Sequence, residues 1–271
     1  MTALSVVLIN GGRDGDLESC SRLLARQAAQ ERPELVVVTT PTSPDVRRRI
    51  EAAAPGVRWI EVDRFGVGLM RNRGLAAAGG EIVLFLDTDT RVQPGALDAL
   101  VGAFSRYPRL GAAGGKLVGP DGTLQFSARR FYTLASLVLR RIPGERARNS
   151  RAVRSHLLAE WDHDDERVVD WIVGACFAMR RRAADEVGGF SEDSAFGFED
   201  VDWCHRAAVA GWEVRYVPSA VVVHEWVRSS FGLNTRTLMH VYAAGRFYLR
   251  ARSRSRSARP PAAPRRLAPS R

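Results

Sequence analysis

Long hydrophobic runs and paired cysteines are both missing from this sequence of 271 residues. No apolar stretch approaches the roughly 20 residues that a helix needs to cross a bilayer, so we expect no transmembrane span. The three cysteines, Cys20, Cys176 and Cys204, lie far apart and form no C-x-x-C pair, which argues against a disulfide framework or a structural zinc site. The first residues lack the basic n-region of a signal peptide. They predict a cytoplasmic protein, either free or at the inner face of the cell membrane.

Acidic residues are absent from the C-terminal tail, residues 250–271, which is rich in Arg, Pro, Ser and Ala. Eight arginines in this tail supply most of the formal net charge of +10 and leave +2 for residues 1–249. Such a composition cannot bury a core, so we predict a disordered tail. The tail is either a solubilising end or a segment that binds anionic lipid or polyphosphate surfaces. We expect no nucleic-acid partner, and deleting the tail tests the opposite hypothesis.

Apolar, β-branched runs alternate with helical patterns through the first 107 residues. The predicted strands are residues 4–9, 34–38, 57–62 and 82–86, and the predicted helices are residues 16–29, 46–54, 70–78 and 94–107. This order predicts an α/β fold with an open, mostly parallel central sheet and helices on both faces. Beyond residue 110 we expect a hairpin at 116–126, a basic amphipathic helix at 131–142, a charged loop at 146–166, a helix at 200–210 and a last helix at 233–249.

Two carboxylates directly follow the fourth predicted strand, in Asp87-Thr88-Asp89. Ligands of open parallel sheets bind at the carboxyl ends of the strands, so topology places these acids at a binding edge. The two charges repel each other unless a cation lies near them, and Mg²⁺ or Mn²⁺ prefers such oxygen ligands. A solvated turn is the alternative for the tripeptide alone. Its position after a buried strand favours the metal site.

A second acidic pair, Glu199-Asp200, stands in a segment rich in aromatic residues. Aromatic surroundings limit water and raise the pKa of a carboxyl group, which suits a general base near neutral pH. The alternative is capping, because acids in the first helical turn interact favourably with the helix dipole, and Asp202 is the best candidate for capping alone. His224 ends a strand and becomes a metal ligand only if the fold returns it to the side of Asp89.

A glycine-containing loop at Gly66 and Gly68 opens a helix that carries Arg71, Asn72 and Arg73. Such loops allow the backbone to approach a phosphate or a ribose, and the arginines add affinity for anions. A short glycine pattern is weak evidence by itself. It gains weight only beside the other motifs.

Together these motifs resemble the family 2 glycosyltransferases, and their rhamnosyltransferase-like branch in particular. The resemblance runs from about residue 5 to residue 224 and is strongest over residues 169–224. That segment keeps, in order, a Gly-Ala-Cys strand, a Val-Gly-Gly-Phe turn, an E-D-x-D helix start, an Ala-Gly-Trp turn and a terminal His. The resemblance implies a Rossmann-like GT-A domain over residues 1–249, with a nucleotide-sugar half at 1–107 and an acceptor half at 108–249.

The resemblance also implies an activity. A sugar, rhamnose or another hexose, would pass with inversion from a nucleoside-diphosphate sugar to a hydroxyl of a glycan or lipid-linked acceptor in cell-wall or polysaccharide biosynthesis, with Mn²⁺ or Mg²⁺ as cofactor. The implied metal ligands are Asp87, Asp89 and His224, and the implied general base is Asp200 with Glu199 as the alternative. The donor site is assigned to Thr39, Gly66, Gly68, Arg71, Asn72, Asp87, Thr88 and Asp89, and the sugar or acceptor pocket to Trp171, Gly174, Ala175 and Cys176.

Two positions depart from the family pattern. Thr39 stands where members of the family usually carry an Asp that contacts the nucleobase, and Arg64 replaces a common Asn. The choice of nucleotide therefore stays open, and a non-catalytic nucleotide-sugar or glycan-binding module is the second hypothesis. The basic helix at 131–142 and the last helix either rest on a membrane surface or pack as ordinary amphipathic helices.

Overall fold

The computed structural model describes residues 4–26, 33–193, 197–225 and 242–250. The first half of the chain alternates strands and helices as the sequence predicts. Its elements are β1 (Leu4–Asn10), α1 (Asp14–Arg26), β2 (Glu34–Thr39), α2 (Pro44–Ala53), β3 (Arg58–Glu61), α3 (Val67–Ala77), β4 (Ile82–Asp87), β5 (Thr90–Val92) and α4 (Ala96–Arg106).

The second half holds shorter elements. They are β6 (Leu110–Val118), β7 (Leu124–Gln125), β8 (Ala128–Arg129), α5 (Leu134–Leu139), α6 (Glu145–Arg148), α7 (Arg151–His156), β9 (Arg167–Val168), β10 (Trp171–Ile172), β11 (Cys176–Arg180), α8 (Arg181–Val187), α9 (Glu199–Val209) and β12 (Glu213–His224). The predicted hairpin is confirmed as the antiparallel pair β6–β7. The predicted loop at 146–166 is wrong, because α7 lies within it and buries Val153 and His156. The predicted basic helix is confined to α5.

The last predicted helix and the tail fall largely on residues outside the described ones. Residues 242–250 are helical, which supports the C-terminal part of the helix predicted at 233–249. The predicted disordered tail, residues 250–271, lies outside the described residues apart from Arg250 at its start. Within the described part of the chain, no helix combines the length and the apolar character that crossing a membrane requires.

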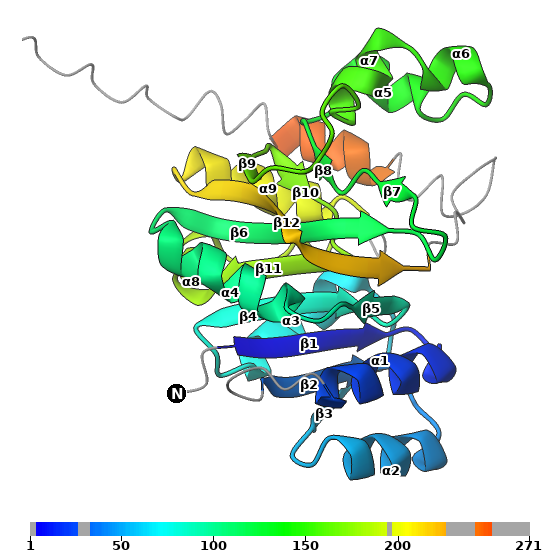
Figure 1. Cartoon of the computed structure of the whole chain (residues 1–271), viewed down its shortest axis with the longest axis vertical. Coiled ribbons are helices and arrows are strands. Elements are labelled where there is room, and N and C mark those ends of the chain that lie inside the picture. The colour runs from blue at the N-terminus through cyan, green and yellow to red at the C-terminus, as the bar shows by residue number, and fades with distance from the viewer. Residues whose placement is uncertain (1–3, 27–32, 194–196, 226–241, 251–271) are drawn as a thin grey trace, which may run out of the picture.

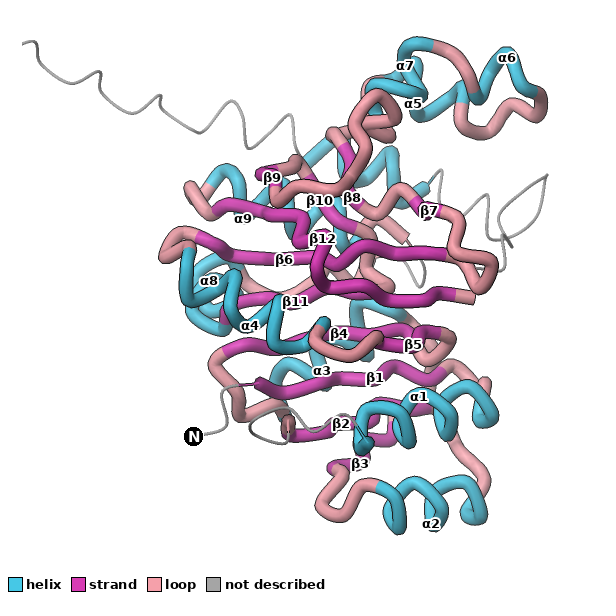
Figure 2. The backbone as a smooth tube through the Cα atoms, in the orientation of Figure 1, coloured by secondary structure: helices cyan, strands magenta, loops and turns pink. Residues whose placement is uncertain are grey.

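The central sheet runs in the order β3-β2-β1-β4-β11-β6-β12-β5 (Figures 1 and 2). Strands β1 to β4 are parallel, and β6 and β12 are parallel to each other. Strand β11 runs antiparallel between β4 and β6 and joins the two groups. The mostly parallel sheet is therefore confirmed, and its continuity brings distant parts of the chain to one edge.

Helices cover both faces of the sheet because successive strand residues point to opposite sides. In β1 and β4, Val7 and Phe85 join a cluster that includes residues of α3, α8 and α9. Their neighbours Leu8 and Leu84 join a second cluster with residues of α1, α2 and α4. These strand side chains are at most 1% exposed, so both faces of the sheet are buried, as parallel sheets require.

A bulge in strand β12 changes which face of the sheet its alternate side chains point to. Val217 pairs with Gly115 but Val221 pairs with the next residue, Lys116, so residues 218–220 form a bulge. Beyond the bulge, β12 pairs antiparallel with β5, and His224 lies opposite Thr90. At the end of the molecule far from α2, helices α5 to α7 form an arm that extends beyond the sheet (Figure 1).

Candidate active site

A cleft of about 710 Å³ opens at the carboxyl ends of β1 and β4 and extends toward α9 and the arm. Both acidic motifs contribute to its lining: Asp87, Thr88 and Asp89 on one side, and Glu199 and Asp200 on the other. These motifs are more than 100 residues apart in the sequence, yet they face one space. A substrate in the cleft can therefore contact both.

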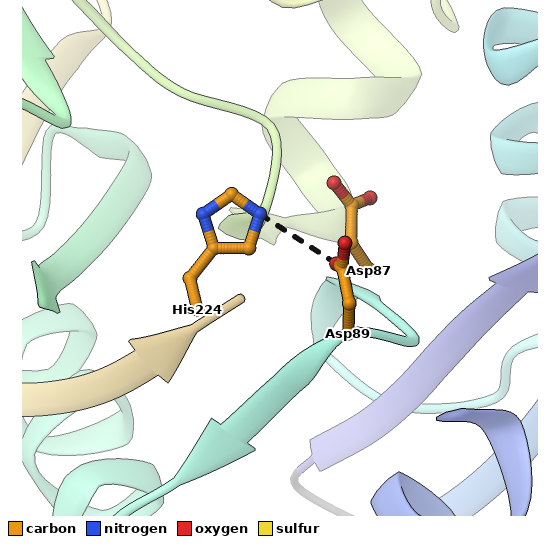
Figure 3. Close-up of side chains that lie close together, drawn as sticks. All are labelled: Asp87, Asp89 and His224. Atoms are coloured by element: carbon orange, nitrogen blue, oxygen red, sulfur yellow. Dashed lines mark ion pairs between the residues drawn. The ribbon is translucent and has the colours of Figure 1, made fainter. Parts of the chain in front are cut away.

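A candidate metal centre lies on the first side of the cleft. One ligand atom each from Asp87, Asp89 and His224 lies within 4.8 Å of the other two. Figure 3 shows the imidazole of His224 directed at Asp89, with 3.6 Å between Nε2 and Oδ1. Burial, and then the charge of Asp87, raise the pKa of Asp89, so a cation near both carboxylates would relieve their repulsion. Two carboxylates and an imidazole fit Mn²⁺ or Mg²⁺.

Gln125 on β7 orients His224 for this task. Its Nε2 donates to the His224 carbonyl at 2.8 Å, so its Oε1 faces the imidazole Nδ1, also at 2.8 Å. Because an amide oxygen only accepts, Nδ1 carries the proton and Nε2 keeps its lone pair toward Asp89. The sequence predicts that His224 becomes a metal ligand only if the fold returns it to the side of Asp89. The pairing of β12 with β5 brings it there.

Arg71 lies between the two acidic motifs. Its side chain is 2% exposed, and its guanidinium is 2.9 Å from Glu199 Oε1 and 3.7 Å from Asp87 Oδ1. The nitrogen nearer Asp87, Nη2, also donates to the carbonyl oxygen of Gly174 at 2.8 Å. One buried cation thus fixes the start of α9 relative to the end of β4, and the negative charges around it offset the cost of its burial.

Glu199 and Asp200, the two acids at the start of α9, differ in exposure. Glu199 is 7% exposed, its Oε2 has no hydrogen-bond partner among the described residues, and burial followed by the charge of Asp200 raises its pKa to about 7. Asp200 is half-buried and accepts hydrogen bonds from the backbone nitrogens of Gly174 (3.0 Å) and Val201 (2.8 Å). Burial raises the pKa of Asp200 despite the nearby Arg71. Both acids thus lie in the first turn of α9, and the pKa of each is raised.

The backbone before α9 is bent to present this pair. Gly197 and Phe198 both have positive φ angles, of 90° and 68°. For a bulky residue such as phenylalanine this conformation costs energy and persists only where the surroundings enforce it. The Phe198 ring lies 5.2 Å from that of Tyr132, in the aromatic cluster beside the cleft. Asp202, by contrast, forms an ion pair with Arg206 at 2.8 Å and does not line the cleft.

Four residues assigned to the donor site are outside the lining of the cleft. Thr39 is 3% exposed, and its hydroxyl lies 2.6 Å from that of Thr42. Asn72 binds the backbone of Phe190 through both amide atoms, at 2.7 and 2.9 Å. Gly66 precedes α3, and Gly68 lies against the Ser191 carbonyl, which leaves no room for a side chain. Their donor role stays a prediction, and Gly68 and Asn72 support the loop that follows α8.

Of the four residues assigned to the sugar or acceptor pocket, three line the cleft and one does not. Trp171, Gly174 and Ala175 line the cleft. Cys176 begins β11 opposite Leu86, and its side chain is buried with the cluster around that strand, which raises the pKa of its thiol to about 12. The structure therefore places Cys176 in the core and not in the pocket. A β-carbon at Gly174 would press on the Arg71 guanidinium, so a larger residue there would require that buried side chain to shift.

Sequence reasoning did not assign a role to several residues that line the cleft: Arg13, Phe65, Gln125, Tyr132, Arg129 and Arg140. Arg13 follows β1 and lies 3.0 Å from Asp89. The rule that selected Asp87, position at the carboxyl end of a parallel strand, also applies to Arg13. The others lie on short elements whose place depends on the tertiary fold.

Comparison with known proteins decides the class of this molecule. The family model described as "Glycosyltransferase like family 2" matches residues 13–243, which include both acidic motifs and His224. This chain belongs to glycosyltransferase family 2. The family resemblance noted from the motifs is confirmed, and the cleft is the candidate active site of a glycosyltransferase.

Two curated relatives come from Mycobacterium tuberculosis. An N-acetylglucosaminyl-diphospho-decaprenol L-rhamnosyltransferase is 33% identical over 224 residues, covering 77% of this chain and 72% of the relative. A pre-mycofactocin glycosyltransferase is 32% identical over 164 residues, covering 59% of this chain and 30% of the relative. The first of these confirms the rhamnosyltransferase-like branch.

Two solved structures share the fold. GalNAc-T7 with UDP, GalNAc and Mn²⁺ has a TM-score of 0.67 at 17% identity, and the match covers 93% of this chain and 48% of that one. The mannosyltransferase PcManGT from Pyrobaculum calidifontis, solved with GDP-Man and Mn²⁺, has a TM-score of 0.60 at 18% identity, with 96% and 65% covered. The chain thus spans about half of the first structure and under two thirds of the second. The GT-A fold is confirmed.

Proposed function

We propose that this family 2 chain is an inverting glycosyltransferase that moves rhamnose or another hexose from a nucleoside-diphosphate sugar to a hydroxyl of a lipid-linked glycan. The observation that carries the proposal is the single cleft shared by the Asp87–Asp89 and Glu199–Asp200 motifs. Residues 1–107 form the nucleotide-sugar half in this proposal, and residues 108–249 form the acceptor half.

The donor diphosphate binds beside Asp87, Asp89 and His224. A divalent cation bound there would neutralise the charge of the diphosphate. Arg13 lies 3.0 Å from Asp89 and is half exposed, so it can turn from that carboxylate to a donor phosphate. Both solved structures contain Mn²⁺, which supports a divalent cofactor.

Asp200 is the general base. Its raised pKa makes it a stronger proton acceptor than an exposed Asp, and its place in the cleft gives it access to substrate. The acceptor oxygen forms a bond to the anomeric carbon while the bond from that carbon to the diphosphate breaks. The hydroxyl proton passes to Asp200, and the nucleoside diphosphate leaves. Attack from the face opposite the leaving group inverts the anomeric centre.

Asp200 is favoured over Glu199 as the base because of their partners. Glu199 is buried and its Oε1 pairs with Arg71, so its carboxylate is committed to the structure of the site. Among the described residues, Asp200 accepts from two backbone nitrogens, which leaves lone pairs for a substrate hydroxyl.

The acceptor and the membrane are linked in this proposal. The Mycobacterium tuberculosis relative is named for N-acetylglucosaminyl-diphospho-decaprenol, a sugar on a lipid diphosphate. Here Leu134 (73% exposed) and Val138 (50%) on α5, and Ile142 (46%) two residues beyond its C-cap Arg140, are spaced four residues apart and form an apolar stripe. The chain from residue 130 to residue 154 also carries arginines at positions 130, 141, 146, 148, 151 and 154. Such a surface fits the cytoplasmic face of an anionic membrane.

Sugar transfer tests the proposal. A panel of nucleotide sugars is assayed with Mn²⁺ and a lipid-diphosphate acceptor, for the wild type, Asp200→Asn and Glu199→Gln. We expect Asp200→Asn to lower kcat by roughly 100- to 10,000-fold, the usual contribution of a general base. Asp185→Asn removes an exposed acid outside the cleft and is the control. Donor binding with no turnover that depends on Asp200 would indicate a binding module instead.

Membrane contact is tested by vesicle flotation. The double variant Leu134→Gln, Val138→Gln is expected to lose binding to phosphatidylglycerol vesicles that the wild type retains. Substituting Val168, which is also 50% exposed but lies outside the arm on β9, gives the control. Equal flotation of all three proteins would reject the arm as the contact surface.

A further inference from the structure

Two arginines line the acceptor side of the cleft without an ion-pair partner among the described residues. Arg129 ends β8, and its Nε donates to the Phe126 carbonyl at 2.8 Å. Arg140 follows α5, and its Nη1 lies 2.9 Å from the Tyr132 hydroxyl and 3.1 Å from His156 Nε2. All of these acceptors are neutral. Neither guanidinium forms a close ion pair with a described residue, although the negative charge of Asp200 in the same cleft opposes the lowering of the Arg129 pKa.

The surroundings intensify this charge. Burial, and then the positive charge of Arg140, lower the pKa of Arg129 to about 10, so the guanidinium still carries its proton at neutral pH. Burial and the same two arginines lower the pKa of His156 to about 2, which keeps His156 neutral and able to accept from Arg140. Two partly buried cations that repel each other are costly, and an anion between them would reduce that cost.

Aromatic rings hold both guanidinium groups in place. Arg129 lies over the ring of Trp171 at 5.0 Å, its partner in the β8–β10 pair, and Arg140 lies over the ring of Tyr132 at 5.8 Å. Tyr132 in turn packs against His156, with ring centres 4.1 Å apart. Most surface arginines move freely in solvent. These two are pre-organised, so they lose less entropy when a ligand binds.

We propose that Arg129 and Arg140 form an anion subsite that binds the phosphate or diphosphate linking the acceptor sugar to its carrier. The inference deepens the proposed function and rests on it. Guanidinium groups bind phosphate oxygens through paired, charge-assisted hydrogen bonds. The donor diphosphate occupies the opposite side of the cleft, beside Asp87 and Asp89. Asp200 lies in the same cleft, where the acceptor hydroxyl meets the donor sugar.

The first measurement is direct binding of inorganic pyrophosphate in metal-free buffer, by isothermal titration calorimetry. We compare Arg129→Gln and Arg140→Gln with Arg130→Gln, which removes an exposed charge next to Arg129 but outside the cleft. Arg130→Gln should bind as the wild type does. Each cleft variant should bind roughly 10- to 100-fold more weakly, the loss expected for one charge-assisted contact. Equal binding by all four proteins overturns the subsite.

The second measurement uses two acceptors with the same sugar, a short-chain prenyl diphosphate of N-acetylglucosamine and the neutral octyl N-acetylglucosaminide. The KM for the charged acceptor should rise in both cleft variants by the same factor as the pyrophosphate affinity falls, and the KM for the neutral acceptor should not change. Transfer with an unchanged KM for the charged acceptor rejects the subsite alone. Arginine-dependent pyrophosphate binding without any sugar transfer rejects the proposed function and retains the subsite.

Two further measurements test whether the arginines bind bulk lipid headgroups and whether each variant folds. Binding to phosphatidylglycerol vesicles should be the same in the cleft variants and the wild type, and a loss confined to vesicles would assign the arginines to bulk lipid headgroups and overturn the proposal. Circular dichroism checks the fold of each variant. If Arg129→Gln does not fold, Arg129→Lys and Arg140→Gln carry the test, and the lysine variant should keep part of the pyrophosphate affinity.

Discussion

Replacing Arg71 by methionine should destabilise the whole domain, because this side chain joins the two acidic motifs. Methionine keeps most of the length but leaves Glu199 Oε1 and the Gly174 carbonyl without their donors at 2.9 and 2.8 Å. Breaking a buried ion pair by removing one partner costs about 3–5 kcal/mol. For a domain of this size each kcal/mol lowers Tm by about 2–4 °C, so we expect a fall of roughly 6–20 °C in a circular dichroism melt.

The pH dependence of this loss sharpens the test. Arg71 opposes the raised pKa of Glu199, so the variant should raise that pKa further. The cost of Arg71→Met is then larger at pH 8, where Glu199 must bury a charge, than at pH 5, where it binds a proton. Arg73→Met removes an exposed charge from the same helix and should change stability by less than about 0.5 kcal/mol. Equal melts for the two variants would refute the argument.

Three further predictions concern the site. In the wild type, the pKa of Glu199 is raised from 4.5 in the unfolded chain to about 7 in the folded protein. The free energy of unfolding should therefore fall as pH rises from 4.5 to about 7, and urea titrations of Glu199→Gln should lack this fall. Mn²⁺ at 100 times its Kd should stabilise the wild type by about 2.7 kcal/mol, and EDTA should reverse the gain in Tm. His224→Ala should weaken this response, whereas an undiminished Mn²⁺ shift would remove His224 from the metal centre. Gly174→Ala should cost about 1–3 kcal/mol in thermal melts through its clash with Arg71, and a neutral outcome would contradict the close approach.

The parallel half of the fold could be predicted from sequence because its signals are local. Each strand of the first half is a short run of apolar, β-branched residues, and each is followed by a helical pattern. The topology of such sheets predicts Asp87 and Asp89 at the binding edge from the strand pattern alone. The Glu199–Asp200 pair was found through its motif, and the structure adds that a buried arginine connects it to the first motif.

The second half could not be predicted in the same way, because its arrangement depends on contacts that are distant in the sequence. The insertion of β11 between β4 and β6 follows from packing, and the residues of β11 carry no sign of their partners. The arginine-rich stretch around α7 suggested a loop, yet Val153 and His156 bury one side of a short helix. Gln125 and Tyr132 gain their roles only when β7 and the arm meet the cleft.

The bulge at residues 218–220 determines which way the end of β12 faces. Before it, Val214 and Tyr216 join one core cluster, and after it Val222 joins the other. His224 continues the phase of Val222, since side chains alternate along a strand. Deleting or inserting one residue in the bulge would exchange the directions of Val223 and His224, and the imidazole would leave the carboxylates. A change in length outside the lining of the cleft can therefore abolish cation binding in a relative whose aspartates and histidine are all retained.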